Sequence, residues 1–223
     1  MSTDKVTVII TNWNYGMFLR EAVESILAQT VLPKRIIFAD DGSTDNSLEI
    51  EQEYVSKYPG LIELSRVEER QGLPDNLRRN AALVDTPWMC FLAADDMFKP
   101  TYIEKALQFM DEPRLAIIYS DMEKFGNWSG LWAVSDWNED ELRRGNYING
   151  HAFILKQAYD EAGGFRREVN GSKEFFEDFY MWIDICDLKK GYYGRRIPEP
   201  LVMYRRHDFG HRTDKTDLHT RNK

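Results

Sequence analysis

The clearest indication of the fold is the segment Phe91-Leu92-Ala93-Ala94-Asp95-Asp96-Met97. It closes an apolar run that begins at Trp88, after Pro87, and such a run is typical of a short buried strand ending in a loop. Asp95 and Asp96 then lie at the carboxyl end of a strand, the edge where open α/β sheets bind ligands. Neighbouring carboxylates repel each other in a partly dry crevice, so we expect a divalent cation there, Mg²⁺ or Mn²⁺. The alternative is a solvated turn whose acids cap the next helix.

The composition is that of a globular protein. The chain has 223 residues, of which 43% are hydrophobic and 30% charged, which suits one α/β domain with a buried core. A formal net charge of −8 argues against general nucleic-acid binding and against an anionic membrane surface. Because the sequence shows neither a signal-peptide pattern nor an apolar segment of membrane-spanning length, we expect a cytoplasmic protein with at most peripheral membrane association.

Buried strands and amphipathic helices alternate through the first half of the chain. The predicted strands are residues 6–11, 35–40, 61–64 and 88–94, and the predicted helices are 18–29, 45–55 and 73–84. This alternation indicates βαβ winding, so we expect an α/β fold with a mostly parallel central sheet flanked by helices.

The second half has a weaker pattern. Its predicted elements are helices at 101–110, 156–163 and 176–188 and strands at 115–119 and 196–204. Residues 125–150 show little periodicity and are expected to form an irregular segment or a β-ribbon. Residues 211–223 are polar, and we expect a mobile tail there.

The ends of the predicted strands place further chemistry beside the acidic pair. Trp13 follows the first strand and offers a flat ring on which a base could stack, while Asp41 follows the second and offers a carboxylate that only accepts hydrogen bonds. Uracil presents an N–H at its ring edge, whereas cytosine presents an acceptor there. A uridine nucleotide therefore fits the Asp41 carboxylate better than a cytidine nucleotide does, and a guanine nucleotide is not excluded. Taken alone, Trp13 could be a packing residue and Asp41 a turn residue.

Several segments closely resemble the family 2 glycosyltransferases of the GT-A fold. The matching segments are residues 6–30, 38–45, 79–80, 92–96, 163–165, 177–178 and 204–207, in order along nearly the whole chain. The resemblance implies one Rossmann-like GT-A domain at 1–210. Residues 1–97 would form its nucleotide-binding half and residues 98–210 its acceptor and catalytic half. Many members carry a further Asp where Ala93 stands, whereas this sequence keeps the last two acids of the motif, Asp95 and Asp96.

The resemblance also implies roles at the donor nucleotide. The positions matching Thr11 and Trp13 hold the base, and the acid matching Asp41 bonds the uracil edge. The arginine matching Arg79 lies near the base and the diphosphate, and Asp95 contacts the ribose or the metal shell.

For metal binding and catalysis, the match makes Asp96 the direct metal ligand and Asp178 the general base. It places His207, with Arg205, near the diphosphate or the metal. A sugar hydroxyl attacks only once a carboxylate takes its proton, and one base without a covalent sugar intermediate implies inversion. Without the resemblance, the Glu177-Asp178 pair could simply be acids at a helix N-terminus, and His207 a surface or core histidine.

Acceptor contacts are the weakest prediction. Trp128, Trp132 and Trp137 could form a platform for sugar rings or could anchor an irregular segment on the core. Of these we select Trp132, together with Glu177, as acceptor candidates.

The sequence as a whole indicates an inverting, metal-dependent glycosyltransferase. Its donor would be a nucleotide sugar, with UDP-sugars first, and its acceptor a hydroxyl of a glycan, a lipid-linked sugar or another molecule. A sugar-nucleotide pyrophosphorylase is disfavoured because residues 12–16 lack a Gly-rich basic phosphate loop. A non-catalytic nucleotide-sugar-binding protein would not need Glu177 and Asp178. The segment from His207 onward is cationic and then polar, which favours a lid ordered by donor and metal.

Overall fold

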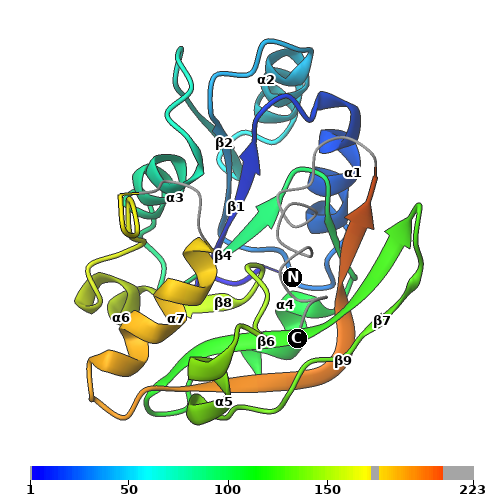
Figure 1. Cartoon of the computed structure of the whole chain (residues 1–223). Coiled ribbons are helices and arrows are strands. Elements are labelled where there is room, and N and C mark those ends of the chain that lie inside the picture. The colour runs from blue at the N-terminus through cyan, green and yellow to red at the C-terminus, as the bar shows by residue number, and fades with distance from the viewer. Residues whose placement is uncertain (1, 172–175, 208–223) are drawn as a thin grey trace.

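In the described residues, 2–171 and 176–207, nine strands form one mixed sheet that runs through the middle of the molecule (Figure 1). The structure is a computed structural model. The strand order is β3-β2-β1-β4-β8-β6-β9-β5, and β7 pairs with β6. The strands are β1 (Val6–Asn12), β2 (Arg35–Asp40), β3 (Ile62–Arg66), β4 (Trp88–Ala93), β5 (Met97–Phe98), β6 (Leu115–Gly126), β7 (Gly130–Trp132), β8 (Phe153–Leu155) and β9 (Tyr193–Arg206).

Helices cover both faces of the sheet (Figure 1). They are α1 (Gly16–Leu27), α2 (Ser47–Lys57), α3 (Leu73–Ala81), α4 (Tyr102–Leu107), α5 (Glu139–Arg144), α6 (Lys156–Glu161) and α7 (Glu177–Asp187). Side chains alternate along β1, so Ile10 belongs to the core cluster that holds residues of α1, α2 and α4, whereas Ile9 belongs to the cluster that holds residues of α3, α6 and α7. The two hydrophobic cores make a three-layer α/β/α arrangement.

The first four strands in the sheet order are all parallel. Ile10 of β1 pairs with Phe38 of β2 on one side and with Leu92 of β4 on the other. The antiparallel pairs of the described residues all involve the short strands β5, β7 and β8, so the predicted α/β fold with a mostly parallel sheet is confirmed. Because parallel strands end on the same edge, Asn12, Asp40 and Ala93 meet there, and the loops that follow them lie together.

The second half holds more regular structure than its sequence pattern predicts. β6 continues beyond Tyr119 to Gly126, and β9 begins at Tyr193, so the two strands pair in parallel over most of their length. The segment expected to be irregular or a β-ribbon contains the β6–β7 hairpin and α5. The outer part of β6 and much of β9 are only partly buried, so their sequences lack the apolar pattern that predicts a buried strand.

No helix among the described residues is long and apolar enough to span a lipid bilayer. Cys90 and Cys186 are buried free thiols. The expected tail at 211–223 and the expected lid beyond His207 lie outside the described residues.

Candidate active site

Asp96 joins three separate parts of the chain at the carboxyl end of β4. Its side chain is buried, with 1% exposure, in the tight turn between β4 and β5. One carboxylate oxygen lies 2.7 Å from His151 Nε2, and the other accepts a 2.7 Å hydrogen bond from the Arg205 backbone N–H. The direct-ligand role of Asp96 stays a prediction, and both of its oxygens already have protein partners.

Asp95 faces His207 beside this carboxylate. The distance from Asp95 Oδ2 to His207 Nε2 is 3.1 Å, and the imidazole packs against the rings of Tyr15 and Phe18 from the start of α1. Burial, followed by the charge of Asp96, raises the pKa of Asp95, although the His207 hydrogen bond opposes the shift. The fold therefore brings together the acids and the histidine that were predicted to surround a metal.

Arg205 lies against the same pair. Its Nε donates to the Asp95 carbonyl oxygen at 2.8 Å and its Nη2 to Glu21 at 2.7 Å. The guanidinium also lies over the rings of Phe18 and Phe125. The predicted diphosphate-binding arginine is thus placed beside the acidic pair by hydrogen bonds within the protein.

The donor set suits a divalent cation only in part. Within residues 2–171 and 176–207, no three His, Cys, Asp or Glu side chains form a cluster that could hold a metal ion. Asp95 and His207 provide one carboxylate and one imidazole that face each other. Mn²⁺ and Mg²⁺ commonly take few protein ligands and complete their shells with phosphate oxygens and water, so this pair fits such an ion.

The predicted base site lies under a loop that connects β3 to α3. Thr11 ends the pairing of β1 with β4, and Trp13 just beyond it is 38% exposed. The guanidinium carbon of Arg70 lies 3.4 Å from the centroid of the Trp13 ring. Asp41 is buried and accepts hydrogen bonds from the backbone N–H groups of Gln71 and Gly72, at 2.9 and 2.8 Å. Arg70 therefore covers a face of the ring on which a base was predicted to stack.

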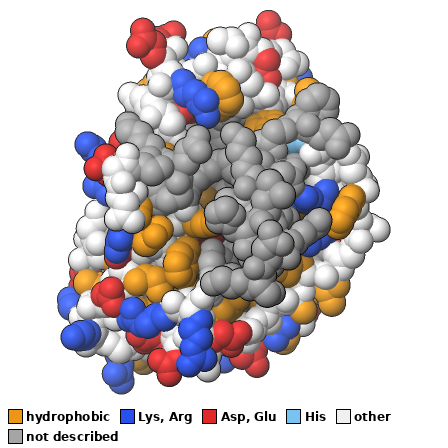
Figure 2. Space-filling view, viewed as in Figure 1, with side chains coloured by type: hydrophobic (Ala, Val, Ile, Leu, Met, Phe, Trp, Pro, Cys, Tyr) orange, Lys and Arg blue, Asp and Glu red, His pale blue; other side chains and the backbone are white. Residues whose placement is uncertain are grey.

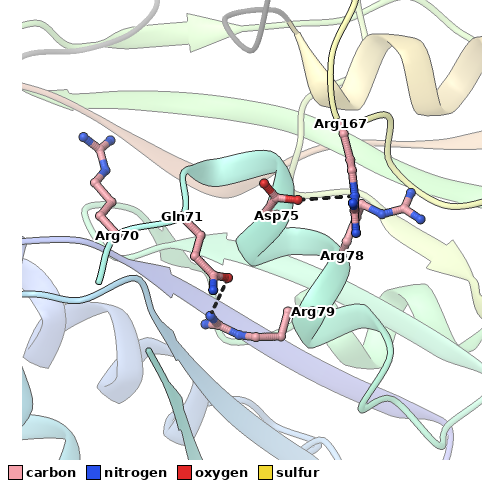
Figure 3. Close-up of a pocket in the computed structure, with 6 residues that line it drawn as sticks. All are labelled: Arg70, Gln71, Asp75, Arg78, Arg79 and Arg167. Carbon is pink, nitrogen blue, oxygen red and sulfur yellow. Dashed lines mark hydrogen bonds and ion pairs between the residues drawn. The ribbon is translucent and has the colours of Figure 1, made fainter. Parts of the chain in front are cut away.

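A basic pocket adjoins this loop and α3 (Figure 3). Its volume is about 740 Å³, and it is lined by Arg70, Gln71, Asp75, Arg78, Arg79 and Arg167. Arg79 is held by Asn76 Oδ1 at 3.0 Å and by the Asp40 carbonyl oxygen at 3.2 Å. Four guanidinium groups against one lining carboxylate give the pocket an excess of positive charge, which suits a phosphate-bearing ligand.

Beneath the base site, buried polar groups hold the ends of β1 and β2. The Asn12 side chain donates to Asp40 and to Glu51, and Arg66 pairs with Asp40 at 2.7 Å. Glu51 has no exposed surface, and burial, followed by the charge of Asp40, raises its pKa to about 8. This network fixes the backbone from which Trp13 and Asp41 extend.

Asp178 is the second residue of α7. Its carboxylate accepts from the Phe179 N–H at 2.7 Å and from Asn146 Nδ2 at 3.3 Å. Burial raises the pKa of Asp178 to about 6, and the Phe179 hydrogen bond limits the shift. A carboxylate with this pKa is ionised at neutral pH and is a stronger base than an ordinary aspartate. Glu177 beside it is buried, with 6% exposure.

The tryptophans of the second half separate into two groups. Trp132 is 39% exposed on β7, packs edge-on against Tyr204 of β9 and lies under Lys124. Trp128 is more exposed, whereas Trp137 packs so closely on Gly194 that a Cβ atom there would overlap its ring. In Figure 2, hydrophobic side chains lie in several separate groups on the viewed face. Trp137 anchors its segment, and Trp132 stays an acceptor candidate.

Three residues of this site were not singled out from the sequence. His151 contacts Asp96, Asn146 contacts Asp178, and Arg70 covers Trp13. The local sequence feature that could have identified His151 as a site residue is its position directly before the apolar run 152–155. Asn146 and Arg70 lie in loops whose sequence has no distinguishing pattern.

The fold and the acidic edge define a GT-A-like class of α/β protein. Staphylococcus aureus TarS 1-349, solved in complex with UDP-GlcNAc, superposes with a TM-score of 0.77 at 16% identity, over 94% of this chain and 60% of TarS 1-349. The mannosyltransferase PcManGT from Pyrobaculum calidifontis, solved with GDP-Man and Mn²⁺, superposes with a TM-score of 0.71 at 17% identity, over 92% of this chain and 58% of that one.

Sequence comparison then identifies the family. The family described as "Glycosyl transferase family 2" matches residues 7–170, so the chain belongs to this family. The putative glycosyltransferase EpsE of Bacillus subtilis is 25% identical over 92% of this chain and 74% of its own length. The uncharacterized glycosyltransferase YibD of Escherichia coli is 34% identical over 67% of this chain and 42% of its own length. The uncharacterized glycosyltransferase alr2836 of Nostoc is 35% identical over 47% of this chain, and the match covers only 32% of that relative.

Proposed function

We propose that this chain transfers a sugar from a nucleotide sugar to an acceptor hydroxyl with inversion at the anomeric carbon. The observation that carries the proposal is the contact of one short segment both with Asp178, whose pKa is raised, and with the acidic pair beside His207. Membership of the family and the nucleotide-sugar complexes of TarS and PcManGT support it.

In this proposal the donor nucleotide lies along the carboxyl edge of β1, β2 and β4. The base would stack on Trp13 near Asp41, whose carboxylate has lone pairs beyond those that bind Gln71 and Gly72. Arg79, with Arg78 and Arg167 of the basic pocket, would balance the charge of the diphosphate. UDP-sugars are the first donors to test, with GDP-sugars second because PcManGT binds GDP-Man.

The acidic pair and His207 would hold a divalent metal ion, Mn²⁺ or Mg²⁺, with Asp96 as the direct ligand that the family resemblance implies and Asp95 facing His207 beside it. When bound, the ion supplies positive charge that stabilises the departing nucleoside diphosphate. Arg205 keeps the carbonyl of Asp95 in place and so orients this side of the site.

Asp178 takes the proton of the acceptor hydroxyl as that oxygen attacks the anomeric carbon. The bond from this carbon to the diphosphate oxygen breaks in the same displacement, so the configuration inverts. The acceptor would be a hydroxyl of a glycan or of a lipid-linked sugar, with Trp132 and Glu177 as candidate contacts.

A screen of nucleotide sugars tests the proposal. Thermal shift with and without Mn²⁺ should identify the donor, and product analysis should then show transfer or slow donor hydrolysis. Binding without either reaction would favour a non-catalytic sugar-nucleotide-binding protein. Formation of a nucleotide sugar from a sugar phosphate and UTP would instead indicate a pyrophosphorylase.

A further inference from the structure

The segment 146–151, between α5 and β8, contacts two acidic groups of the proposed site. At one end, Asn146 Nδ2 donates to Asp178 Oδ2 at 3.3 Å. A Cβ atom at Gly150 would lie 3.6 Å from the same oxygen, so the backbone passes directly against that carboxylate. At the other end, His151 Nε2 lies 2.7 Å from Asp96 Oδ2. The segment therefore spans the distance between the proposed base and the acidic pair.

The His151 side chain is held rigidly. Its Nδ1 lies 3.0 Å from the Phe91 carbonyl oxygen, which only accepts, so Nδ1 carries a proton and donates. The carbonyl oxygen of His151 accepts from Tyr102 Oη and from Cys90 Sγ, both at 3.0 Å. With 8% of its surface exposed, His151 is largely shielded from a substrate, and its hydrogen bond to Asp96 is the contact through which it would act on the site.

Asp96 in turn holds the end of β9. Its second oxygen accepts the Arg205 N–H at 2.7 Å, and the Arg205 side chain donates to the Asp95 carbonyl oxygen. His207, which faces Asp95, follows two residues later. Any change in the Asp96 carboxylate is thereby transmitted to the proposed metal-binding pair.

We infer that His151 is a positioning residue that fixes the acidic pair relative to Asp178 through its hydrogen bond to Asp96. The inference rests on the proposed function. A single displacement needs the proton acceptor and the leaving group at a fixed separation, and a misplacement of about 1 Å can cost about a hundredfold in rate. The segment 146–151 meets that requirement because side chains from one short stretch of chain contact both carboxylates.

Two amide substitutions separate this role from packing. In His151→Gln the amide nitrogen takes the place of Nε2 and retains the hydrogen bond to Asp96. In His151→Asn it takes the place of Nδ1 and retains only the bond to Phe91. We expect His151→Gln to keep kcat within about tenfold and His151→Asn to lose about a hundredfold, with the donor KM changing less than kcat. Thr86→Val is the control, since Thr86 is buried and hydrogen-bonded at the opposite end of β4.

Hydrogen exchange at the Arg205 amide gives a second readout that needs neither donor nor metal. Exchange should be faster in His151→Asn and nearly unchanged in His151→Gln and in Thr86→Val. The inference is overturned if the two His151 variants behave alike, or if His151→Asn lowers only the melting temperature, as Thr86→Val should. If the unmodified protein transfers no sugar, the proposed function fails, and the Arg205 amide alone still decides whether His151 fixes Asp96.

Discussion

Asp95 and His207 are 112 positions apart in the sequence, yet the carboxylate and the imidazole lie 3.1 Å from each other. Asp95 follows β4, and His207 follows β9, which is not a direct neighbour of β4 in the sheet. Two contacts bridge the gap, because β5 pairs with β9 directly after the acidic turn and Asp96 binds the Arg205 N–H. The short distance between Asp95 and His207 therefore depends on the pairing of β5 with β9.

Substitution at this pair should remove the metal-dependent part of donor binding. We expect Asp95→Asn and His207→Ala each to abolish the Mn²⁺-stimulated increase in UDP affinity, measured by calorimetry with Mn²⁺ and with EDTA. Asp111→Asn, which changes an exposed carboxylate paired with Lys5, is the control. Asp96→Asn should act in the same direction, since Asp96 is the predicted ligand and also holds Arg205. Unchanged metal dependence in all three variants would remove the acidic turn from the metal site.

Loss of the proposed base should affect chemistry and not binding. Asp178→Asn keeps the size of the side chain and its hydrogen bond from Phe179, so donor affinity should stay within a few fold. Transfer should fall on the order of a hundredfold or more, the usual contribution of general-base catalysis. Single-turnover rates at saturating donor would measure this. A variant with near-normal turnover would shift the role to another group, and Glu177 would be tested next.

The pH dependence of sugar transfer by the unmodified protein gives a second test of Asp178 as the general base. Burial raises the pKa of Asp178 to about 6, so the base is ionised above that pH and protonated below it. The value of kcat should be level near pH 7.5 and should fall about tenfold per pH unit well below pH 6. A profile that stays level down to about pH 5 would contradict the assignment of Asp178 as the base.

Arg70 should compete with the donor base for the Trp13 ring. Removing it in Arg70→Ala takes away a cation–π contact at 3.4 Å, which is worth about 0.5–1 kcal/mol at an exposed site, so UDP should bind about two- to fivefold more tightly. Arg20→Ala removes an exposed arginine that contacts Tyr54 elsewhere and should leave UDP affinity unchanged. Weaker UDP binding to Arg70→Ala would mean that the guanidinium contacts the bound donor instead.

Glu51 should make the fold less stable as the pH rises. Burial raises the pKa of this carboxyl from its ordinary value of 4.5 to about 8 in the folded protein. The contribution of the protonated carboxyl to folding stability is therefore fully present below pH 4.5 and is lost as the pH rises to about 8. Glu51→Gln should therefore stabilise the protein at pH 8, on the order of 2–4 kcal/mol, and much less at pH 4.5. Urea unfolding at the two pH values measures the difference. Equal effects at both would show that Glu51 is ionised in the folded state.

Asp41 should set the base preference. Its carboxylate can accept the N–H of uracil but would repel the ring acceptor of cytosine, so UDP should bind better than CDP. Competition titrations with UDP, CDP and GDP would rank the bases. Equal affinity for UDP and CDP would exclude Asp41 from base recognition, and tighter binding of GDP would make a guanosine sugar the donor.

The first half of the fold and the edge on which the site lies could be predicted from local sequence patterns. The apolar runs that end at Asp40 and at Ala93 are local patterns of buried parallel strands, and the acids that follow such strands meet at one edge by geometry alone. Membership of the family was predictable for the same reason, because its motifs follow those strands.

The neighbours of each of these acids became visible only in the three-dimensional structure. His151 reaches Asp96 and Arg70 covers Trp13 through contacts between segments far apart in the chain. His207 reaches Asp95 because β6 and β9 pair in parallel along polar stretches that show no apolar period. The hydrogen bonds between paired strands join backbone groups and do not require a particular side-chain pattern. The periodicity of apolar residues therefore did not predict which of these distant segments would lie side by side.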